Sequence, residues 1–100
     1  VAMRTLLAVV ALVLSAGPTS ALGPPARFDY APNPSPTVIP TADIEGVCRP
    51  FGSSQRYGCA FIIEKKCFVF VNSALKRTEK AAVLRHEFAH CNGWPANHPS

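Results

Sequence analysis

His86 and His90 lie four residues apart, and Glu87 stands between them. Two imidazoles at this spacing project from one face of a helix, one turn apart, and can therefore bind the same metal ion. The Glu87 carboxylate can take a proton from a water bound to that ion, which would make the water a nucleophile. The H-E-x-x-H pattern thus predicts His86 and His90 as metal ligands and Glu87 as a general base for hydrolysis.

Such a site needs a third ligand, and we expect it to be His98. The sequence has 3 histidines, all of them between residues 86 and 98. A catalytic zinc ion commonly has three protein ligands and one open position. Gly93 allows the chain to turn, and five residues of at most ~3.5 Å each can bring His98 back to the metal. Asp43, Glu45 or a residue of a partner chain are the alternatives.

A helix over residues 79–92 would position the first two ligands. Thr78 suits the N-cap position, and Glu79 is an acidic residue in the first turn, where the helix dipole favours it. Gly93 suits the left-handed position that often follows the last turn. The sequence therefore predicts a capped helix close to the C-terminal end of the chain.

The predicted helix has two faces of different character. Apolar residues recur at helical spacing along one face, namely Ala81, Leu84, Phe88 and Cys91. We expect this face to pack on the rest of the domain. His86 and His90 lie on the other face with Ala82 and Val83, and would be presented to a cleft.

Two short apolar runs before this helix predict a β-hairpin. Residues 60–63 and 67–71 are rich in β-branched and aromatic side chains, which is typical of strands. Between them stands the sequence Glu-Lys-Lys at 64–66. Lys-Lys is poor chemistry for a tight two-residue turn, so a longer loop is expected here.

The 4 cysteines predict two disulfides, because an even number in a small exported chain is usually paired. A cysteine zinc site is the competing interpretation, but the sequence has no C-x-x-C pair. Cys91 belongs to the packing face of the helix, so we favour Cys67–Cys91 together with Cys48–Cys59. All three possible connectivities remain open from the sequence alone.

The N-terminal residues 1–21 have the features of a secretory signal peptide. One basic residue precedes an apolar run over 5–14, and small residues stand at 19 and 21, where a signal peptidase would cleave. A membrane anchor is the alternative, but the run is shorter than the ~20 residues of a spanning helix. We expect a secreted or periplasmic protein that has no membrane contact after cleavage.

The remaining chain divides into two parts. Residues 22–43 form a proline-rich segment, expected to be an extended leader, and residues 44–100 form the compact domain. Removal of Arg4 with the signal peptide would lower the net charge from +4 to +3. This charge is scattered, with no basic helix face, so a nucleic-acid partner is not expected.

The segment from His86 to His90, continued by Cys91-Asn92-Gly93-Trp94 and by His98-Pro99, resembles the active-site helix of zincin metallopeptidases. It is similar to that of small exported bacterial proteins described as zinc peptidases. The resemblance covers residues 75–99 and implies one Zn²⁺ per chain, held by His86, His90 and His98, with Glu87 as the catalytic base. The spacing differs from two zincin patterns: the metzincin third-ligand position is Ala96 here, and no gluzincin-type acidic residue follows Glu87.

Together these features predict an α+β fold, a small disulfide-stapled domain in which a β-hairpin or short sheet packs on one C-terminal active-site helix. The expected function is that of an exported zinc-dependent metallopeptidase acting on a peptide or protein substrate. The alternatives are a non-catalytic zinc-binding structural or interaction module and a periplasmic zinc-holding protein. An H-E-x-x-H string can also occur by chance on an ordinary helix.

Overall fold

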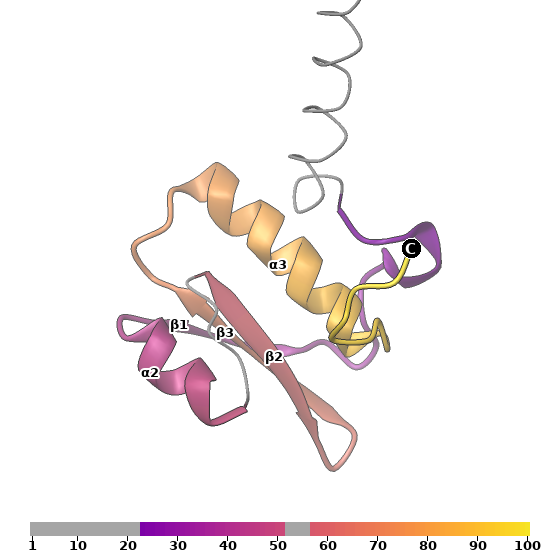
Figure 1. Cartoon of the computed structure of the whole chain (residues 1–100), viewed down its shortest axis with the longest axis horizontal. Coiled ribbons are helices and arrows are strands. Elements are labelled where there is room, and N and C mark those ends of the chain that lie inside the picture. The colour runs from indigo at the N-terminus through magenta and orange to yellow at the C-terminus, as the bar shows by residue number, and fades with distance from the viewer. Residues whose placement is uncertain (1–22, 52–56) are drawn as a thin grey trace, which may run out of the picture.

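The computed structural model describes residues 23–51 and 57–100, and the expected signal peptide lies outside them. A three-stranded sheet has the order β1-β3-β2 and comprises β1 (Thr37–Thr41), β2 (Gly58–Ile63) and β3 (Lys66–Asn72). The long helix α3 (Arg77–Cys91) lies along this sheet. The short helix α2 (Ile44–Cys48) packs near one end of the sheet (Figure 1). The expected α+β fold class is confirmed.

The two helices cover opposite faces of the sheet. Cys59 and Cys67 project from different faces, because the strand partner of Cys67 is Ile62, three residues after Cys59. Cys59 is bonded to Cys48 of α2, and Cys67 is bonded to Cys91 of α3. Each disulfide therefore fixes one helix to one face.

Both expected disulfides are present. The Cα–Cα distances are 5.8 Å for Cys48–Cys59 and 5.7 Å for Cys67–Cys91. The first bond is part of a small core formed by Ile44, Cys48 and Cys59, with Phe70 packed against it. A chain of this size buries little apolar surface, so these covalent links replace much of what a larger core would supply.

The sheet begins before Ile44, where we expected the compact part to start. Residues 37–41, in the segment expected to be an extended leader, form β1 and pair in parallel with β3 from Phe68 to Asn72. Pro40 lies within β1, which is tolerated because β1 is an edge strand and one side of it needs no hydrogen bonds. The segment is extended, but it is part of the domain.

The hairpin between β2 and β3 turns more tightly than expected. Ile63 pairs directly with Lys66, so Glu64 and Lys65 alone form the turn. Both adopt left-handed conformations, with φ of 51° and 67°. Two such residues make a turn whose twist matches that of the paired strands, and full strand pairing offsets the local cost. The expectation of a longer loop was wrong.

Helix α3 begins two residues earlier than expected. Lys76, not Thr78, is its N-cap, and the Glu79 side chain accepts a hydrogen bond from the Lys76 N–H at 3.1 Å. The helix ends at Cys91, one residue before the expected end, and the predicted stop at Gly93 is confirmed. Gly93 has a φ of 104°, and the N–H groups of Gly93 and Trp94 donate to the carbonyls of the last turn.

The face of α3 that packs on the sheet differs in part from the expected one. Cys91 points to β3 as expected, but Ala81 is exposed. The helix instead approaches β2 at Gly58, where an added Cβ would lie 3.1 Å from Val83 Cγ1 and 3.5 Å from Glu87 Cγ. Because glycine has no side chain, Val83 and Glu87 can occupy this space.

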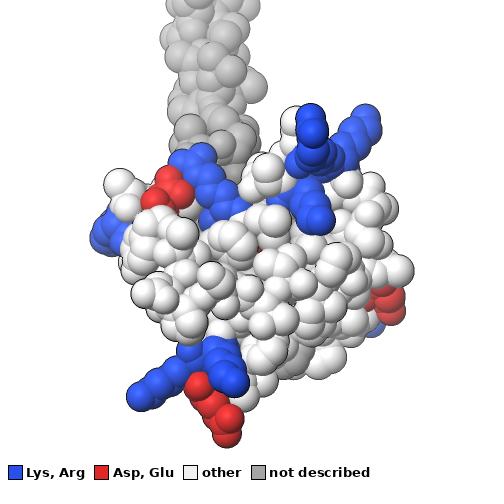
Figure 2. Space-filling view, turned by 180° about the vertical axis from the view of Figure 1, so that it is seen from behind, with Lys and Arg blue, Asp and Glu red and all other residues white. Residues whose placement is uncertain are grey.

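No helix of the described residues is long and apolar enough to cross a membrane. The two disulfides indicate folding in an oxidising environment. On the face shown in Figure 2, Lys and Arg side chains stand in small separate groups, with a broad uncharged area between them.

Candidate metal centre

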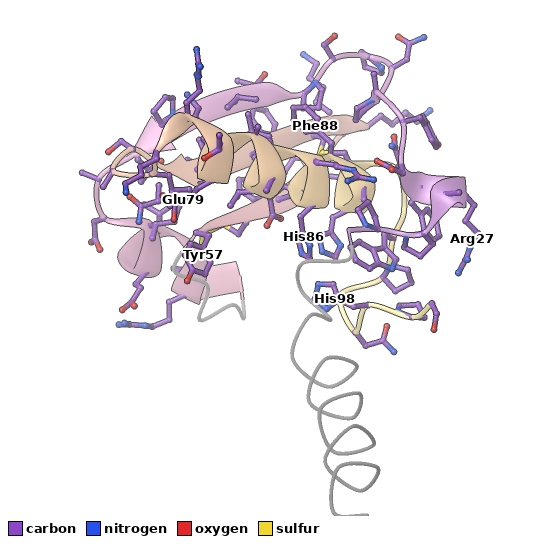
Figure 3. The ribbon with its side chains drawn as sticks, turned by 90° about the horizontal axis from the view of Figure 1, so that it is seen from above. Arg27, Tyr57, Glu79, His86, Phe88 and His98 are labelled. Carbon is purple, nitrogen blue, oxygen red and sulfur yellow. A yellow bond between two sulfur atoms is a disulfide. The ribbon has the colours of Figure 1, made fainter. Side chains whose placement is uncertain are left out.

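The structure brings together the three histidines that the sequence indicated. The Nε2 atoms of His86 and His90 are 3.2 Å apart, and each is 3.1 Å from Nε2 of His98. His86 and His90 come from the last two turns of α3, and His98 from the segment that follows it; His86 and His98 lie side by side in Figure 3. Residues twelve positions apart thus converge on one point.

The orientation of His90 is set by a backbone contact. Its Nδ1 is 2.7 Å from the carbonyl oxygen of Trp94. A carbonyl can only accept, so Nδ1 carries the proton, and in the neutral ring the lone pair is on Nε2. The Nε2 atom of His90 faces the other two histidines. A metal ligand is commonly fixed in this way by a second hydrogen bond on the far side of its ring.

A tight return loop brings His98 to the centre. The His98 N–H donates to the carbonyl of Pro95 at 2.9 Å, which closes a four-residue turn. His98 itself has a φ of 57° and is exposed. A left-handed conformation is uncommon for a residue other than glycine, and such strain is concentrated at functional sites. The turn therefore holds His98 in a conformation that it would not adopt by preference.

The three nitrogens fit a single metal ion. Two ligands with bonds of about 2.0–2.1 Å in a tetrahedron are separated by about 3.3 Å, close to the observed 3.1–3.2 Å. Among the described residues, these histidines are the one group of three or more metal-ligating side chains. Three His close together could thus hold a metal ion.

The alternative ligands named from the sequence are occupied elsewhere. Asp43 caps α2 by accepting a hydrogen bond from the Gly46 N–H at 3.1 Å. Glu45, a residue of α2, lies 4.0 Å from Arg49 in an exposed ion pair. Neither belongs to the histidine group.

The surroundings favour neutral imidazoles. Burial lowers the pKa of His86 to about 4, and the neighbouring His90 and His98 add to this effect. Burial also lowers the pKa of His90, against an opposing contribution from its hydrogen bond to Trp94. Metal binding requires deprotonated nitrogens, so both side chains are already in the binding form at neutral pH.

Glu87 occupies a different position from the histidines. It is 6% exposed and lies on the sheet side of α3, next to Gly58. Burial alone raises the pKa of its carboxyl to about 7. The carboxylate is not a member of the ligand group. Glu87 is therefore a carboxyl group that can gain or lose a proton near neutrality.

Trp94 is a further component of the centre, although the sequence analysis gave it no role there. Its side chain is 8% exposed, and its ring centroid lies 5.1, 5.0 and 4.9 Å from those of His86, His90 and His98. Trp94 packs against all three imidazoles. The sequence signal for this role was the position of Trp94, directly after Gly93 and between the second and third histidines.

The segment before β1 is fixed to the end of α3 that carries the histidines. The Asn92 side chain donates to the carbonyls of Phe28 and Tyr30 at 2.9 and 2.7 Å. Arg85 forms a two-pronged ion pair with Asp29. This part of the proline-rich segment is thus packed beside the metal centre.

Comparison with known proteins assigns no family to this chain. No family model matches it, and neither does any curated protein or solved structure. What the chain does is therefore inferred from its own residues.

Proposed function

We propose that this protein is a zinc-dependent hydrolase, a small metallopeptidase that binds one Zn²⁺ through His86, His90 and His98. The observation that carries the proposal is the triangle of Nε2 atoms, each 3.1–3.2 Å from the other two. Catalytic zinc sites commonly have three protein ligands and leave the fourth coordination position to water or substrate, whereas structural sites have four protein ligands.

The three imidazoles suit a divalent transition-metal ion, and we propose that this ion is Zn²⁺. The donor set has no thiolate, because all four cysteines are in disulfides, and no carboxylate. Three imidazoles suit Zn²⁺ and disfavour the hard cations Mg²⁺ and Ca²⁺. When bound, the ion supplies a Lewis acid that polarises a carbonyl and lowers the pKa of water.

Glu87 is proposed as the general base. A base acts best when its pKa is near the working pH, and burial raises the pKa of Glu87 to about 7. The carboxylate accepts a proton from the attacking water and returns it to the leaving amine. Glu87 is not among the grouped ligand side chains, so metal coordination does not occupy its carboxylate.

The substrate is proposed to be a peptide or protein met outside the cytoplasm. The disulfides indicate an oxidising environment, and residues 1–21 have the pattern of a secretory signal peptide. A secreted or periplasmic location is consistent with both.

The test compares Glu87→Gln with Glu64→Gln, a matched control in the exposed hairpin turn. Both variants should retain about one zinc per chain by elemental analysis. Glu87→Gln should lose proteolysis of a general peptide library by about 10²–10⁴-fold, because the base is gone but the ligands remain. Full activity in Glu87→Gln would rule out its role as base.

The second candidate is a zinc-binding module without catalysis, either structural or zinc-holding. The burial of Glu87 favours this non-catalytic candidate, since a general base must reach the water that attacks the substrate. This candidate predicts stoichiometric zinc in the wild type, with no hydrolysis of any peptide in the library.

A further inference from the structure

Trp94 contacts several parts of the metal centre although it offers no ligand. Its backbone N–H donates to the carbonyl of Ala89 at 3.0 Å and closes the last turn of α3. Its carbonyl accepts the His90 Nδ1 proton at 2.7 Å. Its ring is buried and packs on all three imidazoles. These contacts leave one further group on the residue, the indole N–H.

The indole N–H fixes the chain on the far side of His98. It donates to the carbonyl oxygen of Pro99 at 2.9 Å, the residue directly after the third histidine. On the near side, the His98 N–H is fixed by its bond to Pro95. His98 is exposed, so burial does not hold it in place. Its φ of 57° is a left-handed backbone conformation that residues with a side chain rarely adopt. The two hydrogen bonds on either side keep it in place.

We propose that Trp94 is a positioning residue of the metal centre: its indole N–H, through Pro99, keeps His98 in the ligand set and so determines metal affinity. The proposal rests on the proposed three-histidine site. It separates two roles of one side chain. The ring packs against the imidazoles, and the N–H holds the return loop.

Trp94→Phe separates these roles, because phenylalanine keeps an aromatic ring and removes the N–H donor. Zinc affinity of the full chain is measured by competition with a chromophoric chelator in four proteins: wild type, Trp94→Phe, His98→Ala and the double variant. Loss of a group that orients a ligand commonly weakens metal binding by about 10- to 100-fold, and we expect this for Trp94→Phe.

The decisive quantity is the coupling between the two substitutions. If Trp94 acts through His98, Trp94→Phe should change the affinity by less than about 2-fold once His98 is already alanine. A loss of equal size with and without His98 would overturn the proposal. An unchanged affinity of the single variant Trp94→Phe would overturn it as well.

A control separates positioning from general stability. Ile44→Val removes one methyl group from the buried core on the opposite face of the sheet. It should lower the thermal midpoint of the metal-free protein and leave zinc affinity unchanged. If Ile44→Val weakens zinc binding as much as Trp94→Phe does, Trp94 acts only through stability.

A spectroscopic readout gives a second, independent test. Cobalt(II) in place of zinc reports the number of ligands through its visible absorption. The spectrum of Trp94→Phe should match that of His98→Ala, and a wild-type spectrum would refute the role of the N–H. Failure of the wild type to bind zinc or cobalt would instead refute the three-histidine site itself.

Discussion

Glu87 of α3 lies against Gly58 of β2, at a place where the sheet has no side chain. A Cβ at residue 58 would come within 3.5 Å of Glu87 Cγ, 3.1 Å of Val83 Cγ1 and 2.7 Å of the Phe70 carbonyl oxygen. The last of these distances cannot be accommodated without a backbone shift. Gly58 therefore determines how closely the helix that carries the histidines can approach the sheet.

Gly58→Ala should destabilise the protein and move α3 away from β2. Forcing a methyl group into a packed contact costs about 1–3 kcal/mol, and the free energy of unfolding from urea titration should fall by that amount. Ser73→Ala in the exposed turn after β3 is the control and should change little. Equal stabilities of the two variants would show that α3 does not pack on Gly58.

Wild type should lose stability relative to Glu87→Gln as the pH rises, because only wild type has the buried carboxyl that must ionise. In the metal-free protein the pKa of Glu87 is raised from 4.5 to about 7, so the folded state binds this proton more tightly than the unfolded state. Stability from this group is thus full below pH 4.5 and is lost as the pH rises to about 7. The variant should gain about 3 kcal/mol relative to wild type across this range.

The measurement is urea unfolding in the presence of a chelator at pH 5 and pH 8. His86 acts with the opposite sign, because its pKa is lowered from 6.5 to about 4 and its contribution increases as the pH rises between those values. That contribution is common to wild type and variant and cancels in their difference. A difference that does not change with pH would mean that Glu87 is not buried.

The two disulfides should differ in their effect on metal binding. Replacing either pair by serine should lower the free energy of unfolding by about 3 kcal/mol through the greater entropy of the unfolded chain. Replacing Cys67 and Cys91 should also weaken zinc binding, because Cys91 follows His90 and its disulfide ties this turn of α3 to β3. Zinc titration of both double variants checks this, and identical affinities would contradict it.

Asn92 should hold the N-terminal segment beside the metal centre. Its side chain is the donor to the carbonyls of Phe28 and Tyr30, and removing it leaves both without this bond. Asn92→Ala should therefore cost about 1 kcal/mol and speed hydrogen exchange in residues 24–31. Thr37→Ala in β1 is a control for general loosening. Unchanged exchange in residues 24–31 would show that the segment is held by other contacts.

Local chemistry made much of the structure predictable. The left-handed Gly93 and the packing position of Cys91 depend on residues within one helix turn, and both are confirmed. The convergence of the histidines followed from helical spacing and from the short reach between Gly93 and His98. The position of Cys91 on the packing face favoured the Cys67–Cys91 pair that is present, although the sequence alone left all three connectivities open.

Features that depend on distant partners could not be predicted in the same way. Thr37–Thr41 contains a proline and becomes a strand because β3, some thirty residues later in the chain, pairs with it in parallel. Glu64 and Lys65 accept left-handed conformations only because the flanking strands pair fully. The packing of Val83 beside Glu87 depends on Gly58 across the interface, which helix periodicity does not reveal.

X-ray absorption at the zinc edge of the loaded, purified protein tests the central claim most directly. The three-histidine centre predicts three imidazole nitrogens at about 2.0–2.1 Å and no sulfur in the first shell. His98→Ala should reduce the imidazole count to two. Sulfur at about 2.3 Å, or a wild-type spectrum that is unchanged in His98→Ala, would contradict the proposed centre.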